Sequence, residues 1–174
     1  TTDQRSKSLS PMTRSFTKTS PISSIKSPSL AAVKRRGLAV KLDTNGLCPD
    51  ALAILLERRL IDYLAMDIKT SLAHYPLLIK GSFDVKKIGD SIALIMERAP
   101  AYEFRTTCAR PFITRDIMAD IALMIKGANR YVLQKCSRNV QVLDPDFLKE
   151  DHHFFSPEEM QELKAIAQGC AETI

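Results

Sequence analysis

The sequence predicts an α/β fold: a partial (β/α) barrel of about four parallel strands with crossover helices, preceded by a disordered N-terminal tail. Short apolar runs typical of strands alternate four times with segments of helical periodicity. The composition changes sharply at Gly37, the first glycine of the chain. Three of the expected strands carry charged residues on one face, which the interior of a barrel tolerates and a sheet covered on both faces does not.

Eight segments after residue 36 alternate between strand-like and helical patterns. The expected strands are Leu38–Leu42, Asp62–Ile68, Tyr102–Thr107 and Arg130–Lys135. The expected helices are Asp50–Arg59, a segment with Val85, Ile88, Ile92 and Ile95 at helical spacing, a helix capped by Thr114, and a helix that Ser156 opens and that runs to about Cys170. This strand–helix order is typical of parallel strands joined by crossover helices.

Residues 1–36 have a composition unlike that of a folded domain. They contain 14 Ser or Thr, three Pro and no Gly, and they show no sustained hydrophobic period. Such a segment cannot bury enough apolar surface to offset the entropy lost on ordering. We therefore assign 1–36 to a disordered Ser/Thr-rich basic tail and 37–174 to the folded domain. A transit peptide, a plain tail, and foreign sequence joined to a truncated domain are three interpretations of this segment.

The positive charge of the chain belongs to that tail. The formal net charge is +5, and residues 1–36 carry eight basic side chains and one acid, or +7. The difference leaves −2 for 37–174, with 17 basic and 19 acidic side chains. A nearly neutral domain lacks the basic face that nucleic-acid binding requires, so we expect no nucleic-acid partner.

Two further absences in the sequence bear on location. No apolar run approaches the roughly 20 residues needed to cross a bilayer, so we expect no membrane partner. The four cysteines (Cys48, Cys108, Cys136 and Cys170) are dozens of residues apart, without a CxxC pair, as in proteins of reducing compartments. We expect a cytoplasmic protein, or an organellar one if 1–36 is a transit peptide.

Three of the expected strands place an acid and a base two residues apart on one face. These pairs are Lys41/Asp43, Asp67/Lys69 and Glu103/Arg105. One interpretation is a set of mutually satisfied ion pairs that fills a barrel interior. The other is a polar ligand held where Asp43, Lys69 and Thr107 end their strands, because barrel active sites lie at the C-terminal ends of strands.

Four segments carry a resemblance to a known family. They are GLAVKLDTNG, DYLAMDIK, YEFRTT and RYVLQ, at residues 37–46, 62–69, 102–107 and 130–134. In order and spacing they resemble the radical S-adenosylmethionine activating enzymes. The resemblance is greatest to the anaerobic ribonucleoside-triphosphate reductase activating proteins, with the pyruvate formate-lyase activating enzymes as cousins, and it covers residues 37 to about 170.

The resemblance implies both an activity and a site. The family cleaves S-adenosylmethionine with a 4Fe-4S cluster on a CxxxCxxC loop and places a radical on a glycine of a partner enzyme. The cofactor-binding residues that it implies here are Asp43, Thr44, Asn45, Asp67, Lys69 and Arg105. Lys69 would pair with a carboxylate of the cofactor. Arg105 could equally pair with Glu103.

The sequence departs from the family pattern at the cluster motif. The family also has a Gly-Gly-Glu-Pro segment that holds the amino group of the cofactor. This sequence contains neither that segment nor CxxxCxxC, and its first cysteine is Cys48. We therefore expect no cluster, no metal ligands and no catalytic residues in this chain, and no activity from the chain alone. Whether the chain is an enzyme stays open.

The function implied by the resemblance is that of the C-terminal portion of an activating enzyme, with S-adenosylmethionine as cofactor. Its partner would be anaerobic ribonucleoside-triphosphate reductase or another glycyl-radical enzyme. The alternative is a non-catalytic binding or regulatory module that docks on a glycyl-radical enzyme or on a second subunit.

Overall fold

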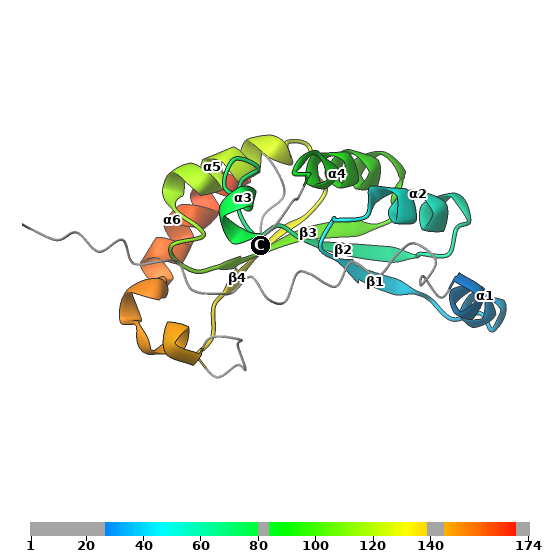
Figure 1. Cartoon of the computed structure of the whole chain (residues 1–174), viewed down its shortest axis with the longest axis horizontal. Helices are drawn as coiled ribbons and strands as arrows, with labels where there is room; N and C mark the ends of the chain where they lie inside the picture. Colours follow the sequence, from blue (N-terminus) through cyan, green and yellow to red (C-terminus); the bar gives the residue numbers. More distant parts are fainter. Residues whose placement is uncertain (1–26, 80–83, 139–144, 170–174) are drawn as a thin grey trace, which may run out of the picture.

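The computed structural model describes residues 27–79, 84–138 and 145–169 (Figure 1). The strands are β1 (Lys41–Thr44), β2 (Tyr63–Asp67), β3 (Tyr102–Cys108) and β4 (Tyr131–Lys135). The helices are α1 (Ser27–Arg35), α2 (Pro49–Glu57), α3 (Tyr75–Leu78), α4 (Lys86–Arg98), α5 (Arg115–Met124) and α6 (Pro157–Gln168), with the 3-10 helices η3 (Pro145–Lys149) and η4 (Asp151–His153).

The four strands form one sheet in the order β1-β2-β3-β4, and every neighbouring pair is parallel. Strands that follow the chain order require every crossover to pass on the same side, because βαβ units are right-handed. The predicted α/β architecture of four parallel strands with crossover helices is confirmed. All C-terminal strand ends consequently meet at one edge.

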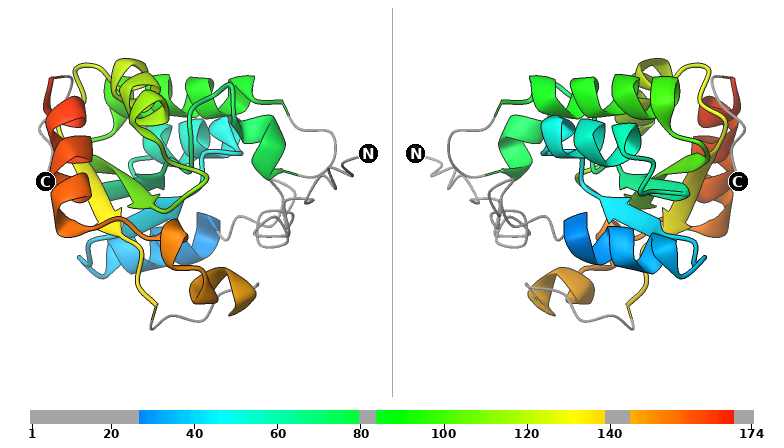
Figure 2. Two further views of the ribbon diagram at one scale, coloured as in Figure 1. Left: turned by 90° about the vertical axis from the view of Figure 1, so that its left-hand side faces the viewer. Right: turned by 90° about the vertical axis from the view of Figure 1, so that its right-hand side faces the viewer.

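The helices are distributed unevenly over the two faces of the sheet. Figure 1 shows α2, α4 and α5 in a layer above the strands, and Figure 2 shows α1 and the η3–η4 segment on the lower side. Within the upper layer α2 packs on α4, and α5 packs on α6. We call the lower face of the sheet, turned away from α2, α4 and α5, the open face.

The core lies between the sheet and the upper helix layer. From the strands it receives Leu64, Met66, Phe104 and Tyr131, which have no exposed surface. From α4 it receives Ile88, Ile92 and Ile95, which recur at helical spacing on one face. Truncating one such side chain to alanine typically lowers the free energy of unfolding by about 2–5 kcal/mol. Because these contacts are made with the helix layer, that layer determines which strand face is buried.

Two buried hydroxyl groups join β3, β4 and the end of β2. The hydroxyl of Tyr131 donates to Thr106 Oγ1 over 2.7 Å, and Thr106 Oγ1 donates to the carbonyl of Ile68 over 2.8 Å. Burial raises the pKa of Tyr131 far above its ordinary value. This chain satisfies polar groups inside an otherwise apolar layer, as buried hydroxyls require.

Helix α1 corrects one prediction from the sequence. It occupies residues 27–35 of the segment 1–36 predicted to be a disordered tail, while residues 1–26 lie outside the described part of the structure. Lys34 Nζ lies 2.5 Å from Asp62 Oδ1, and the Val40 amide donates to Asp62 Oδ2 over 2.6 Å. Lys34 and the Val40 amide lower the pKa of Asp62. The sequence did not show that a later residue, Asp62, holds this helix.

Other element boundaries differ slightly from the prediction. The first strand begins at Lys41 rather than Leu38, and Leu38 is exposed. The last helix opens with the expected capping box, in which Ser156 accepts from the Glu159 amide and Glu159 accepts from the Ser156 amide. It ends at Gln168, and Cys170 lies outside the described residues. The short elements α3, η3 and η4 lacked a periodic signal long enough to predict them.

We predict opposite stability changes for two glycine substitutions. Gly46 has a φ of +75°, and a Cβ there would lie 2.2 Å from Met66 Cε and 3.4 Å from Ile88 Cδ1. Gly46→Ala should therefore lower the free energy of unfolding by about 2 kcal/mol or more. Gly89, within α4, has only Leu72 Cδ1 near its Cβ position, at 3.9 Å.

Gly89→Ala should raise the free energy of unfolding by about 0.5–1 kcal/mol, because alanine favours helix more than glycine does. Urea unfolding of the full chain measures both changes. Equal effects of the two substitutions would contradict the conformation assigned to the turn at Gly46.

Candidate functional site

The open face of the sheet is polar, whereas the helix-covered face is apolar. Alternation along each strand places Asp43, Asp67 and Arg105 on the open face, on three adjacent strands. In the register of the sheet Asp43 lies beside Ala65, and Asp67 lies beside Arg105. This register brings the three side chains within reach of one another across the sheet.

Arg105 is the centre of this face. Its Nη2 lies 2.7 Å from Asp43 Oδ1 and 2.9 Å from Asp67 Oδ1, and its Nε donates to Asp67 Oδ1 over 3.0 Å. Burial alone would lower the pKa of Arg105, but the carboxylates of Asp67 and Asp43 outweigh it and raise that pKa. One guanidinium on β3 thus ties β1 and β2 to its own strand.

Lys69 completes the cluster two residues beyond β2. Its Nζ donates to Asp67 Oδ2 over 2.9 Å, so Asp67 receives charge-assisted bonds from two different cations. The Lys69 amide donates to the hydroxyl of Tyr75 over 3.1 Å. Tyr75 is buried, and desolvation raises its pKa to about 12, so the hydroxyl remains neutral and able to accept.

Thr44 and Asn45 lie beside this cluster in the turn that follows β1. Thr44 Oγ1 accepts from the Gly46 amide, and Asn45 Oδ1 accepts from the Leu47 amide, both over 3.1 Å. These bonds shape the turn that ends the strand. Their use of the side-chain oxygens was not visible in the sequence, and the cofactor contacts of Thr44 and Asn45 stay a prediction.

A second cluster surrounds Glu103 at the N-terminal end of the open face. The hydroxyl of Tyr63 donates to Glu103 Oε2 over 2.9 Å, and Lys41 Nζ lies 3.5 Å from Glu103 Oε1. Arg130 Nε lies 3.5 Å from Glu103 Oε2, and Arg105 Nη1 lies 4.0 Å from Glu103 Oε1. Burial and the Glu103 carboxylate raise the pKa of Tyr63. Sequence reasoning paired Glu103 with Arg105 but missed Tyr63 and Arg130.

The expected ion pairs are therefore present, but they are not three separate pairs. Lys41 pairs with Glu103 across the sheet rather than with Asp43, and Asp43 pairs with Arg105. Asp67 and Lys69 pair within one segment, as predicted, and Glu103 and Arg105 also approach each other within β3, at 4.0 Å. Period-2 alternation identified the face, while the pairing across strands depends on register.

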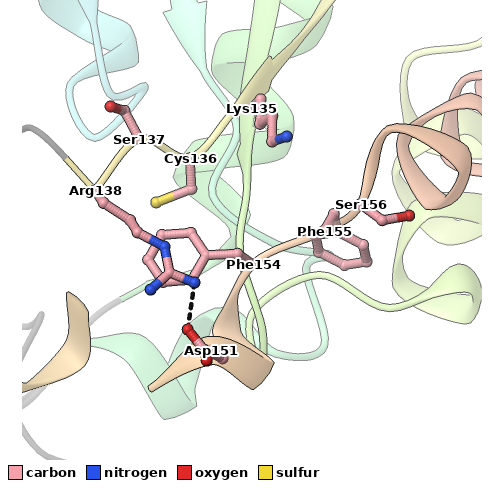
Figure 3. Close-up of a pocket in the computed structure, with 8 residues that line it drawn as sticks. All are labelled: Lys135, Cys136, Ser137, Arg138, Asp151, Phe154, Phe155 and Ser156. Atoms are coloured by element: carbon pink, nitrogen blue, oxygen red, sulfur yellow. Dashed lines mark hydrogen bonds and ion pairs between the residues drawn. The ribbon is translucent and has the colours of Figure 1, made fainter. Parts of the chain in front are cut away.

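A cavity of roughly 620 Å3 lies beyond the end of β4 (Figure 3). Arg138 stacks on Phe154, with its guanidinium carbon 4.3 Å from the ring centroid, and pairs with Asp151 over 2.5 Å. Cys136 also lines the cavity, and desolvation raises the pKa of its thiol. The sequence offered no signal for this cavity, because its lining comes from the end of β4, the residues that follow it, and the segment before α6.

The described cysteines and histidines make no metal-binding group. Cys48, Cys108 and Cys136 are free thiols, and burial raises the pKa of Cys108 to about 12. His153 Nδ1 lies 2.9 Å from the carbonyl oxygen of Phe147. Within residues 27–79, 84–138 and 145–169, no three His, Cys, Asp or Glu side chains are arranged to hold a metal ion. No helix in these ranges is long and apolar enough to span a membrane.

Comparison with known proteins identifies a sequence relative and a solved structural neighbour. No protein-family model matches the chain. A protein of Methanocaldococcus jannaschii, named as a proposed glycyl-radical enzyme activating enzyme, is 31% identical over 106 residues. The chain is homologous to this activating enzyme. The match covers 59% of the chain and 44% of the relative, so the chain spans less than half of the relative's length.

The structural neighbour agrees with this homology at the level of fold. A domain of the pyruvate-formate lyase-activating enzyme from Bacteroides vulgatus superposes with a TM-score of 0.60 at 15% identity. The match covers 84% of the chain and 88% of that domain. At this identity the likeness establishes a shared fold, and the homologous relative supplies the link to glycyl-radical activating enzymes.

We predict that Arg105 stabilises the sheet far more than an exposed arginine does. Arg105→Gln removes the shared partner of Asp43 and Asp67 and should cost about 1–3 kcal/mol of unfolding free energy, because the arginine side chain is only 18% exposed. Arg138→Gln is the matched control, since its partner Asp151 is 86% exposed.

The control should change the unfolding free energy by less than about 0.5 kcal/mol. Urea denaturation of both variants at one ionic strength measures the difference. Losses of the same size would show that the cluster on the open face is no stronger than an ordinary surface pair.

Proposed function

We propose that this chain is part of a radical S-adenosylmethionine activating enzyme for a glycyl-radical protein, of the anaerobic ribonucleotide reductase type. The open face would bind the methionine end of S-adenosylmethionine. One observation carries the proposal: Asp43, Asp67, Lys69 and Arg105 form a single charged cluster at the C-terminal ends of parallel strands. Homology to an activating enzyme supports it.

The cluster has the chemistry that an amino-acid zwitterion requires. The methionine end of the cofactor carries one ammonium and one carboxylate group. The ammonium would bind Asp43, whose side chain is 57% exposed, beside Arg105, and the carboxylate would take a bond from Lys69. The ammonium and the carboxylate together bring no net charge to the site, and each would meet a side chain of opposite charge.

The rest of the site would orient the cofactor. Arg105 holds Asp43 and Asp67 at fixed positions on adjacent strands, and Tyr75 holds the backbone of Lys69. Thr44 and Asn45 would border the same end of the pocket. When bound, S-adenosylmethionine supplies the 5′-deoxyadenosyl group used by this family, and the residues of this chain bind and orient it.

The described residues do not fit the iron–sulfur cluster that the family uses. A cluster of this kind needs several thiolates on one iron–sulfur unit. Cys108 and Cys136 are buried, and desolvation raises the pKa of both thiols and so opposes the thiolate form. Cys48 lies on another segment, before α2. We assign no reaction step of this chain to a cluster.

This mismatch favours a second candidate function. In that alternative the chain is a non-catalytic module that docks on a glycyl-radical enzyme or on a second subunit. The proposed partner in either case is anaerobic ribonucleoside-triphosphate reductase or another glycyl-radical enzyme. Binding of S-adenosylmethionine separates the two candidates, because only the first requires the open-face site.

We predict that the full chain binds S-adenosylmethionine and that Lys69→Gln weakens the affinity by about tenfold or more, as loss of one charge-assisted bond implies. Isothermal titration calorimetry measures the dissociation constants. Lys86→Gln is the control, because Lys86 pairs with Asp90 on the exposed face of α4. An affinity unaffected by Lys69→Gln, or no binding by the unaltered chain, would contradict the proposed site.

A further inference from the structure

Two cations at the N-terminal end of the open face are not used by the proposed cofactor site. Lys41 begins β1, and Arg130 immediately precedes β4. Both approach the carboxylate of Glu103, at 3.5 Å each, from the two opposite edges of the sheet. Their side chains are 49% and 48% exposed, whereas that of Glu103 is 11% exposed. One nearly buried carboxylate thus holds two half-exposed cations.

Glu103 cannot satisfy the donors around it. Lys41 and Arg130 together bring two positive charges to one negative charge, and Arg105 approaches the same carboxylate at 4.0 Å. The ammonium has three N–H donors and the guanidinium five, while the Glu103 carboxylate also accepts from Tyr63. Positive charge and N–H groups therefore remain available to an anion at this end of the face.

Apolar surface adjoins these cations. Lys41 Nζ lies 5.2 Å from the centroid of the Tyr63 ring. Leu38, three residues before Lys41, is one of the few large hydrophobic side chains that the described structure exposes. We define the N-terminal cationic patch as Lys41, Tyr63 and Arg130, which contact Glu103, together with the exposed Leu38 three residues before Lys41.

We propose that the N-terminal cationic patch docks an acidic polypeptide segment of a partner protein. A carboxylate can bridge Lys41 and Arg130, and an adjacent apolar side chain of the same segment can cover Leu38. The two cations are already held by Glu103, so little side-chain entropy is lost when the segment binds. The patch lies at the strand ends opposite the proposed cofactor site, so this inference is independent of that site.

The charge distribution favours a polypeptide over a nucleic acid. Residues 37–174 carry a net charge of −2, from 17 basic and 19 acidic side chains. A nucleic acid presents a continuous row of phosphates and binds through an extended basic surface. The patch instead combines two neighbouring cations with an exposed leucine and a tyrosine ring, which suits a short segment of mixed acidic and apolar residues.

The test is binding of a fluorescein-labelled peptide of glutamates with one central leucine, measured by fluorescence anisotropy on the full chain. The double variant Lys41→Gln/Arg130→Gln should weaken the affinity about tenfold, as loss of two partly exposed ion pairs implies. The double variant Lys86→Gln/Arg98→Gln removes the same charge from α4 and should change the affinity by less than about twofold.

Glu103→Gln provides a second, sharper test, with folding checked by circular dichroism. It makes the chain more positive but removes the carboxylate that holds Lys41 and Arg130 in position. We therefore expect weaker binding of the peptide. Tighter binding would overturn the proposal, because it would mean that charge alone attracts the peptide. Equal losses in the two double variants would overturn it as well, as would no binding of the peptide by the unaltered chain. A single-stranded DNA of equal charge that binds more tightly than the peptide, and depends on Lys41 and Arg130, would replace the acidic segment with a nucleic acid.

Discussion

The bonds from Arg105 to Asp43 and Asp67 are the interaction on which the arrangement of the open face depends. They join three parallel strands through one guanidinium, at distances of 2.7–3.0 Å. Hydrophobic burial explains the opposite face, where isoleucines of α4 cover the strands, but it cannot place charged side chains. The carboxylates of Asp43 and Asp67 hold their positions because Arg105 bridges both, and Lys69 adds a second cation to Asp67.

The two faces of the sheet differ in polarity, and both follow from the alternation of side chains along each strand. Met66 and Phe104 point into the core, while their neighbours Asp67 and Arg105 point to the open face. Since a shift of one residue would exchange the faces, the apolar core also fixes the register of the charged groups. Packing on one side thereby preorganises the polar groups on the other, and the open face divides into a cluster around Arg105 and a cluster around Glu103.

The sequence predicted the strands and the charged face well, because both depend on local periodicity. It could not predict that Lys41 pairs with Glu103, since that contact joins β1 to β3 across the intervening strand. It missed α1, whose attachment depends on Asp62, far away in sequence. It placed Arg130 at the start of a strand but missed its contact with Glu103, and it missed the cavity beyond β4, which forms only when Phe154 and Arg138 come together. Local patterns were visible, and long-range pairings were not.

Solvent exchange of the Arg105 Nε–H tests most directly whether this guanidinium is held in place by Asp43 and Asp67. In a 15N-correlated NMR spectrum of the full chain, the Nε–H of Arg105 bonded to Asp67 should give a sharp signal with slow solvent exchange. This signal should shift on addition of S-adenosylmethionine, because the ligand would rearrange the carboxylates around the guanidinium. A signal broadened by rapid exchange, like those of exposed arginines, would show that the cluster is not fixed and would contradict the account.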